Sequence, residues 1–243
     1  MRQRTGKPLR RAMWAVAAGL ALILGWGAAA FVQRAEMRIA GLPARVDAEL
    51  AAHGQPFVHL SQLPPALVEA TVAVEDRSFW SNPGISLEGI ARSALVDVAS
   101  QSFAEGGSTI TQQLIRDQLL GYQKTLTRKL TEMAYAVLAT RRFPKRTILT
   151  LYLNEVNYGS GAFGIAAAAQ TYFAVPAADL SLAQCTLLAG LPQDPAGLDP
   201  FRHPRAARRR QQAVLQAMVA VGDLSASQAA AAAAAPLSLL PVG

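Results

Sequence analysis

Residues 106–116 read GGSTITQQLIR, a glycine pair followed by hydroxyl residues, two side-chain amides and an apolar helical repeat. The glycines allow the chain to turn, and Ser or Thr is typical of the residue that begins a helix. Converging amides and hydroxyls, with Arg116 on the same helix, favour an anion site for a phosphate or diphosphate. The alternative is a glycine turn with an ordinary helix cap. The stretch lacks the Lys-Ser/Thr ending of a nucleotide P-loop, so ATP is not predicted.

A second polar stretch, Glu75-Asp76-Arg77-Ser78-Phe79, begins at the end of an apolar helix predicted over Ala66–Asp76. Carboxylates are electrostatically disfavoured at the C-terminal end of a helix, so their placement there needs a reason. General acid or base chemistry by a partly desolvated carboxylate is one such reason. The alternative is a solvated helix end with Arg77 as counter-charge.

A third stretch, RKLTE at 128–132, places Arg128, Lys129 and Glu132 on one helical face through its i,i+3 and i,i+4 spacings. Such a trio is usually a surface ion pair. It is followed by a basic stretch that could meet anionic lipid head groups or a diphosphate. That stretch contains Arg141, Arg142, Lys145 and Arg146.

Two further segments are predicted to have a structural role and no catalytic or binding role. The arginines of the helix predicted over Pro204–Val221 are interpreted as a solvated face: Arg205, Arg208, Arg209 and Arg210. The glycine-rich run at 158–164, YGSGAFG, predicts a tight backbone packing site.

A membrane helix is predicted over Ala12–Val32, a run of 21 residues without a charge, because this length spans about 30 Å of hydrocarbon. The preceding segment is basic and has no acid, so the N-terminus is expected in the cytoplasm and the rest outside. The alternative is a signal peptide cleaved near Ala28–Ala30; either interpretation exports the body of the protein. The basic residues are Arg2, Arg4, Lys7, Arg10 and Arg11.

Composition narrows the class of protein. The chain has 243 residues, 51% hydrophobic, with 23 Lys+Arg against 16 Asp+Glu and a net charge of +7. This length suits one domain with a sizeable core, and the low charge content excludes a disordered chain. A collagen, coiled-coil or disulfide scaffold is also excluded. A single cysteine, Cys185, and three histidines make a structural zinc site a poor fit.

Helical periodicity dominates the exported part, and strand signals are few and short. An irregular lead-in is predicted from Gln33 to about Pro65, and the alanine-rich segment Ala226–Ala235 predicts a helical or frayed end without chemistry. Besides Ala66–Asp76 and Pro204–Val221, helices are predicted over Ser86–Ser100, Thr109–Leu120, Thr127–Arg142, Pro144–Leu153, Gly164–Tyr172 and Ser181–Ala189.

Taken together, these motifs resemble a known family. EDRSFWSNPG from Glu75, GGSTITQQLIR from Gly106, RKLTE from Arg128, ILTLYLNEVNYGSGAFG from Ile148 and AAAAQTYF from Ala166 resemble, in order and spacing, the peptidoglycan glycosyltransferases, or murein polymerases. A short chain with one membrane helix resembles the monofunctional form, without a transpeptidase domain. The expected organisation is a basic N-terminus at 1–11, a transmembrane helix at 12–32, a stalk at 33–59, the glycosyltransferase domain at 60–222 and an Ala-rich tail at 223–243.

The resemblance implies a mainly α, lysozyme-like fold with a smaller mobile lobe and lipid II as substrate. Glu75 would be the general base that takes the proton of the acceptor 4-hydroxyl, with inversion at the anomeric carbon, and Glu132 the second carboxylate of the cleft. Asp76 would orient the site and in some members helps to hold a divalent cation, Mg or Mn, which is not required. The donor's diphosphate and sugars would be held by Ser108, Thr109, Gln112, Gln113, Arg116, Lys124, Arg128 and Lys129.

The sequence departs from the family pattern at several positions. Asn82 stands where His is common, Arg116-Asp117 where Lys-Asn is usual, and Thr150 where Glu is frequent. Ala174-Val175 replace Gly-Lys, and Gln184 stands where Glu is common. Both presumed catalytic carboxylates remain, which favours an active enzyme.

Two other functions stay open at this point. A lytic enzyme on the same fold would have no diphosphate to hold, so the cationic and hydroxyl residues between Gly106 and Lys129 argue for synthesis. A catalytically weak, membrane-anchored scaffold is kept open by the departures. The resemblance implies an inner-membrane location and partners that include lipid II, the growing lipid-linked glycan and the membrane. Penicillin-binding proteins or division machinery are further candidates, and no nucleic-acid partner is expected.

Overall fold

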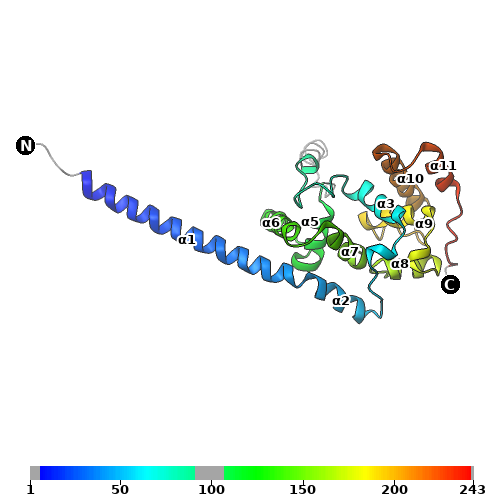
Figure 1. The fold of residues 1–243 in the computed structure, drawn as a ribbon, viewed down its shortest axis with the longest axis horizontal. Coiled ribbons are helices and arrows are strands. Elements are labelled where there is room, and N and C mark those ends of the chain that lie inside the picture. Colours follow the sequence, from blue (N-terminus) through cyan, green and yellow to red (C-terminus); the bar gives the residue numbers. More distant parts are fainter. Residues whose placement is uncertain (1–5, 91–106, 242–243) are drawn as a thin grey trace, which may run out of the picture. The chain divides into compact units, whose positions relative to one another are not determined.

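The computed structural model describes residues 6–90 and 107–241, and the chain divides into two units, 1–40 and 41–243 (Figure 1). The described residues of the first unit form one helix, α1 (Gly6–Ala40), and an 18-residue window within Val16–Ala40 has a mean hydropathy of 1.8. By length and composition this helix could cross a membrane, as the sequence predicts. The irregular structure predicted from Gln33 is wrong, because residues 33–40 contain no glycine or proline and the helix continues to Ala40.

The rest of the predicted lead-in is also largely helical. Gly41 precedes α2 (Leu42–Ala52), and Pro43 lies in its first turn, where a missing N–H costs nothing. Leu42, Val46 and Leu50 recur every four residues and are buried. Pro43 therefore marks a helix start rather than an irregular segment. A short 3-10 helix, η1 (Leu60–Gln62), follows.

The second unit is built from helices, and the described residues form no strand beyond an isolated bridge between Asn157 and Phe163. This confirms the mainly α prediction. The observed ends agree with the predicted ones to within two residues except for the helix predicted over Thr109–Leu120, where α5 ends at Ile115, and only Leu87–Ile90 of the helix predicted over Ser86–Ser100 is described. The longer helices are α3 (Pro65–Glu75), α5 (Ile110–Ile115), α6 (Leu126–Arg142), α7 (Lys145–Glu155), α8 (Ile165–Phe173), α9 (Leu182–Gly190), α10 (Pro204–Val221) and α11 (Ala226–Ala234).

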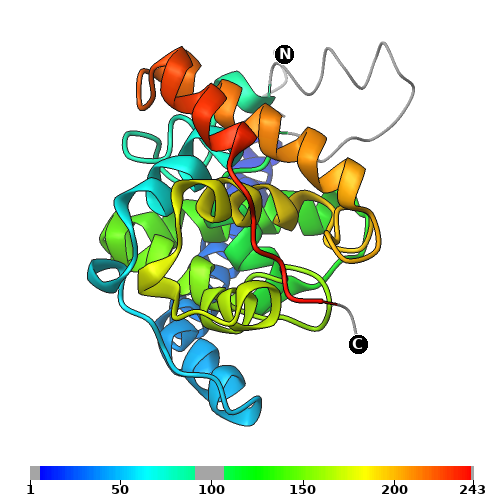
Figure 2. The ribbon, with the colours of Figure 1, turned by 90° about the vertical axis from the view of Figure 1, so that its right-hand side faces the viewer.

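One core lies where α3, α9 and α10 pack together (Figure 2). Small side chains such as Ala70, Ala73 and Ala189 meet Val214 and Met218 there. Small residues allow the helix axes to approach closely, which brings the C-terminal end of α3 within side-chain reach of α10.

A second group surrounds α5, whose six residues are all buried and which packs on α6 and α7. The helix predicted over Thr109–Leu120 changes at Arg116 into a π-helical turn, η2 (Arg116–Leu120), which ends at Gly121. The amide of Arg116 still donates to the Gln112 carbonyl, as in an α-helix, and the π-helical bonding begins with the residues that follow it.

The C-terminal segment is more ordered than a frayed end. Ser225 and Gln228 form a capping box at the start of α11, which packs on α10 and α9. Arg208 donates to the carbonyls of Ala233 and Ala235 at the other end of α11, at 3.4 Å each. Two short 3-10 helices, η3 (Ala177–Asp179) and η4 (Leu191–Gln193), complete the fold.

Candidate active site

Glu75 is the last residue of α3, and its carboxylate meets two other helices. Gln113 of α5 donates from Nε2 to Oε2 at 2.9 Å, and Arg210 of α10 donates from Nη2 to Oε1 at 3.2 Å. The Glu75 side chain is 10% exposed. Burial raises the pKa of Glu75, while Gln113 and Arg210 act against that rise. Each oxygen keeps a free lone pair, so the carboxylate can still accept a proton.

Tyr152 of α7 fixes the orientation of Gln113. Its hydroxyl donates to Oε1 of Gln113 at 3.2 Å, which leaves the amide nitrogen of Gln113 facing Glu75. Burial raises the pKa of Tyr152 well above its usual value, so the hydroxyl stays protonated and remains a donor. The hydrogen bonds therefore run in one direction, with Tyr152 donating to Gln113 and Gln113 donating to Glu75.

Asp76 follows Glu75 but faces a different set of partners. Oδ1 accepts from the Ser78 hydroxyl at 3.0 Å, both oxygens accept from Nδ2 of Asn82 at 3.0 Å, and Oδ2 accepts from the Ile110 amide at 3.3 Å. Burial raises the pKa of Asp76, and these hydrogen bonds oppose the rise. Asp76 thus joins the end of α3 to the start of α5.

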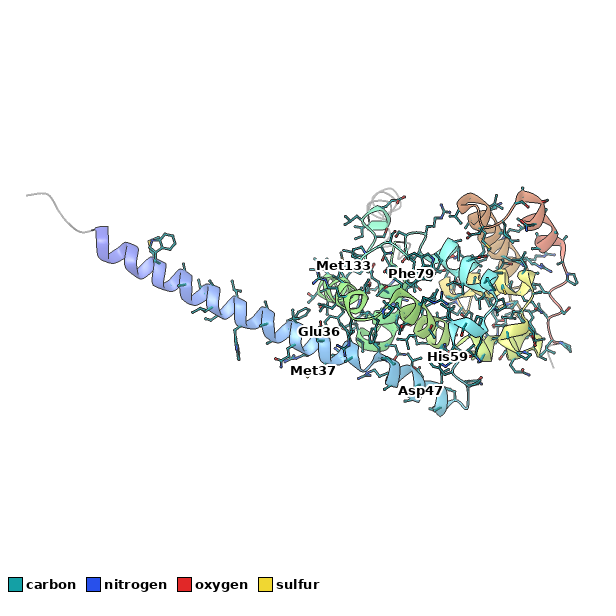
Figure 3. The ribbon with its side chains drawn as sticks, viewed as in Figure 1. Glu36, Met37, Asp47, His59, Phe79 and Met133 are labelled. Atoms are coloured by element: carbon teal, nitrogen blue, oxygen red, sulfur yellow. The ribbon has the colours of Figure 1, made fainter. Side chains whose placement is uncertain are left out.

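Asn82, which departs from the family's histidine, connects this network to α7. Its Oδ1 accepts from Nζ of Lys145 at 2.9 Å and from the Gly84 amide at 2.9 Å. Lys145 also lies 4.7 Å from the ring centre of Phe79, which Figure 3 labels. Burial lowers the pKa of Lys145, and Asp76 opposes that change. Asparagine therefore supplies both a donor and an acceptor at this position.

Glu132 of α6 is the more enclosed carboxylate, with a side chain 0% exposed. Arg128 and Lys129 form ion pairs with its two oxygens, and Gln112 of α5 donates to Oε1 at 3.0 Å. Lys129 also donates to the Ser108 hydroxyl at 2.8 Å and is itself 36% exposed. Arg128, Lys129 and Glu132 therefore do not form a surface ion pair, because the carboxylate of Glu132 that holds the two cations is fully buried.

Thr109 occupies the N-cap of α5, as the capping interpretation describes. Its hydroxyl accepts from the Gln112 amide at 3.1 Å and donates to the Gly84 carbonyl at 2.7 Å, while Gln112 reaches back to the Thr109 amide. These groups are engaged within the protein. Gly106, the first residue of the motif, lies outside the described residues.

The remaining predicted binding residues are Arg116 and Lys124, and the positive charge of Arg116 acts on Glu75. Arg116 pairs with Asp117, with Nε 2.7 Å from Oδ1, and its guanidinium lies 5.3 Å from the ring centre of Tyr122. Lys124 is exposed in the connection between η2 and α6.

A groove of about 540 Å³ runs along α3 beside Val72, Arg77 and Trp80, and its lining includes neither Glu75 nor Glu132. Arg77 lies there, with Nε 3.3 Å from the Ala73 carbonyl. The glycine run is a packing site as predicted: a Cβ on Gly159 would lie 2.5 Å from the Pro195 carbonyl oxygen.

Sequence reasoning missed Arg210, which the prediction placed on a solvated face. Arg205 and Arg209 are exposed as predicted, but Arg210 reaches Glu75. The available signal was helical spacing, because Arg210 lies four and eight residues before Val214 and Met218, which are buried. Tyr152 was likewise not predicted as part of the site, whereas Asn82 was noted only as a departure from the family pattern and Lys145 only as part of a basic stretch.

Comparison with known proteins identifies the family. The transglycosylase family matches residues 45–219. Penicillin-binding protein 1A of Aquifex aeolicus is 41% identical over 183 residues, which are 75% of this chain and 25% of that protein. A Cupriavidus necator protein named "Putative transglycosylase" is 38% identical over 187 residues, which are 77% of this chain and 80% of that protein. The chain belongs to the transglycosylase family, as the motif order predicts.

Two further matches are a second penicillin-binding protein and a solved structure. Penicillin-binding protein 2D of Bacillus subtilis is 37% identical over 76% of this chain and 27% of its own length. A crystal structure of penicillin-binding protein 1A from Haemophilus influenzae aligns with 76% of this chain and 18% of that chain, with a TM-score of 0.46 and 22% identity. The chain spans about a quarter of the length of the Aquifex and Bacillus penicillin-binding proteins.

Proposed function

We propose that this chain is a peptidoglycan glycosyltransferase that polymerises glycan strands from lipid II and releases polyprenyl diphosphate. The observation that carries the proposal is the contrast between the two carboxylates. Glu75 has one donor on each oxygen and some exposure, whereas Glu132 is enclosed and paired with two cations. One carboxylate suits proton transfer, and the other suits the positioning of positive charge.

Glu75 acts as the general base in this proposal. The 4-hydroxyl of the acceptor sugar gives its proton to Glu75 as its oxygen bonds to the anomeric carbon of the donor. The bond from that carbon to the diphosphate breaks, and its electron pair leaves with the diphosphate. Attack from the face opposite the leaving group inverts the configuration.

Arg128 and Lys129 stabilise the negative charge that grows on the departing diphosphate. Glu132 fixes both side chains, and the Lys129 side chain is 36% exposed. Preorganised cations cost no reorganisation during the reaction, which is why their anchoring by a buried carboxylate matters. Ser108, Arg116 and Lys124 extend the proposed binding surface.

Asp76 is a poor ligand for the divalent cation that the resemblance leaves open. Both of its oxygens accept hydrogen bonds from N–H or O–H donors. Among the residues that the structure describes, no group of three or more His, Cys, Asp or Glu is arranged to hold a metal ion. In the proposed mechanism the side chains above carry each step, and polymerisation with and without a chelator tests whether a divalent cation takes part.

The proposed location is the bacterial inner membrane, with α1 as a single-pass anchor, the N-terminus in the cytoplasm and the catalytic domain outside. The apolar span of α1 and the basic residues before it support this orientation. The membrane position keeps the site near a lipid-linked substrate. Penicillin-binding proteins and division machinery remain candidate partners.

The proposal is tested with the purified full-length protein in detergent and labelled lipid II, with and without a chelator. Polymer that lysozyme digests to short fragments supports a synthase. Absence of polymer from folded protein would contradict it, and would favour the scaffold. Shortening of added glycan without consumption of lipid II would favour a lytic enzyme.

A further inference from the structure

Arg210 lies 135 residues after Glu75 in the sequence and belongs to a helix without any of the predicted site residues. Its Nη2 donates to Oε1 of Glu75 at 3.2 Å, on the oxygen that Gln113 leaves untouched. Gln113 is a neutral donor, so Arg210 brings positive charge to this carboxylate. The Arg210 side chain is 18% exposed, which limits the screening of that charge by solvent.

The guanidinium is held in place by α9. Nε of Arg210 donates to the carbonyl oxygen of Gly190 at 3.2 Å. A Cβ on residue 190 would lie 2.8 Å from Cγ of Arg210 and 3.2 Å from Cγ2 of Val214, so glycine leaves the space through which the arginine stem passes. Two independent features therefore aim one nitrogen of Arg210 at Glu75.

The groups that face Glu75 come from four elements besides α3. Arg210 lies on α10, Gln113 on α5, and Arg116 on η2 acts at longer range as a second positive charge. Tyr152 of α7 and Tyr158 are buried, and their raised pKa values keep them neutral. The hydrogen bond from Gln113 and then the charge and hydrogen bond of Arg210 oppose the effect of burial on the pKa of Glu75, and Arg210 is the cation in direct contact with this carboxylate.

We infer that Arg210 is a positioning residue for Glu75: it keeps the carboxylate ionised and oriented for proton removal, which rests on the proposed function of Glu75 as base. A buried carboxylate without such a partner would hold its proton at neutral pH and could not accept another. A carboxylate paired too strongly would be a weak base. Burial of Glu75 together with one cationic hydrogen bond keeps the carboxylate ionised and still basic enough to accept a proton.

The test is the pH dependence of the initial rate of polymerisation of labelled lipid II by full-length protein. The variants are Arg210→Gln, which removes the charge, and Arg210→Lys, which keeps it. Arg209→Gln is the matched control, because Arg209 is the exposed neighbour on the same helix. The rate rises with pH as the base ionises, and this rising part of the profile is its acid limb. Loss of a nearby cation raises the pKa of the base and therefore moves the acid limb to higher pH.

For Arg210→Gln we expect the acid limb to rise by about one pH unit, with a rate loss that approaches about 10-fold on the acid side of the limb and disappears above it. Arg210→Lys should restore most of the wild-type limb, Arg209→Gln should follow the wild type, and KM for lipid II should change little. An equal loss at every pH with an unmoved limb would overturn the inference. If Arg210→Gln does not fold, Arg210→Lys decides: a wild-type limb supports the inference, and a uniform loss overturns it.

Wild-type protein and Glu75→Gln separate this inference from the proposed function. If the wild type makes no polymer, or Glu75→Gln remains active, the proposed function fails and the inference fails with it. If the wild type is active and Glu75→Gln is inactive, an unmoved limb in Arg210→Gln overturns only the role of Arg210.

Discussion

Gln112 and Gln113, adjacent on α5, donate side-chain hydrogen bonds to two different carboxylates: Gln112 to Glu132 at 3.0 Å and Gln113 to Glu75 at 2.9 Å. Successive helical residues point about 100° apart, so one short buried helix can serve both sides of a site. The Asp76 bond to the Ile110 amide fixes the same helix to the end of α3. The positions of the proposed base and of the cation anchor are therefore coupled through α5.

Replacing Gln113 with Leu should impair the base without removing it. The change takes a donor from Glu75 and leaves the buried Tyr152 hydroxyl without its acceptor. We expect a loss of about 10-fold or more in kcat and a cost of about 1–3 kcal/mol in the free energy of unfolding. Steady-state kinetics and denaturant titration check this, with exposed Gln123→Leu as control. Wild-type kcat in a folded Gln113→Leu protein would contradict the coupling.

Glu132→Gln should weaken the hold on the two cations. Arg128 and Lys129 lose a buried counter-charge, so their side chains become less ordered and repel each other. We expect a lower kcat, a higher KM for lipid II and destabilisation of about 1–3 kcal/mol. Exposed Glu88→Gln should match the wild type. The anchoring role is wrong if Glu132→Gln keeps wild-type kinetics.

Asn82→Leu should act mainly on stability. It removes donors from both oxygens of buried Asp76 and the acceptor of Lys145. Unsatisfied buried polar groups cost about 1–3 kcal/mol each, so the free energy of unfolding should fall by at least about 2 kcal/mol. Denaturant titration measures this, with Ser81→Ala at an exposed neighbour as reference. Equal stability of the two variants would show that the network contributes little.

Glu155→Gln should stabilise the protein at neutral pH. Burial raises the pKa of Glu155 well above its usual value, nearby Asp117 and Glu49 raise it further, and Oε2 has no hydrogen-bond partner. The folded state therefore holds a proton that the unfolded state releases above about pH 4.5, so native Glu155 costs stability increasingly as pH rises. We expect a gain of about 1–3 kcal/mol at pH 7 and little at pH 4. A gain that does not grow with pH would refute this explanation.

Local sequence signals predicted the helices but not the contacts between them. Pro204–Val221 was predicted residue for residue, because a proline begins the helix and Gly222 ends it with a φ of +89°. The lead-in was wrong because Pro43 marks the first turn of α2 rather than a break. The motif order proposed Glu75 and Glu132 as the two carboxylates of the site, whereas the pairing of Glu75 with Arg210 joins two residues that lie 135 positions apart, on α3 and α10. The role of Asn82 was not predictable from local sequence either, because its partners are Asp76 at the end of α3 and Lys145 of α7.

The central claim is that Glu75 removes the proton of the acceptor hydroxyl. The most direct test measures, for wild type and Glu75→Gln in detergent, both the binding of labelled lipid II and its incorporation into glycan. The account predicts binding within about threefold of wild type and incorporation reduced by at least about 100-fold, because general-base catalysis is lost while the cationic site remains. Incorporation at the wild-type rate by folded Glu75→Gln would contradict the account.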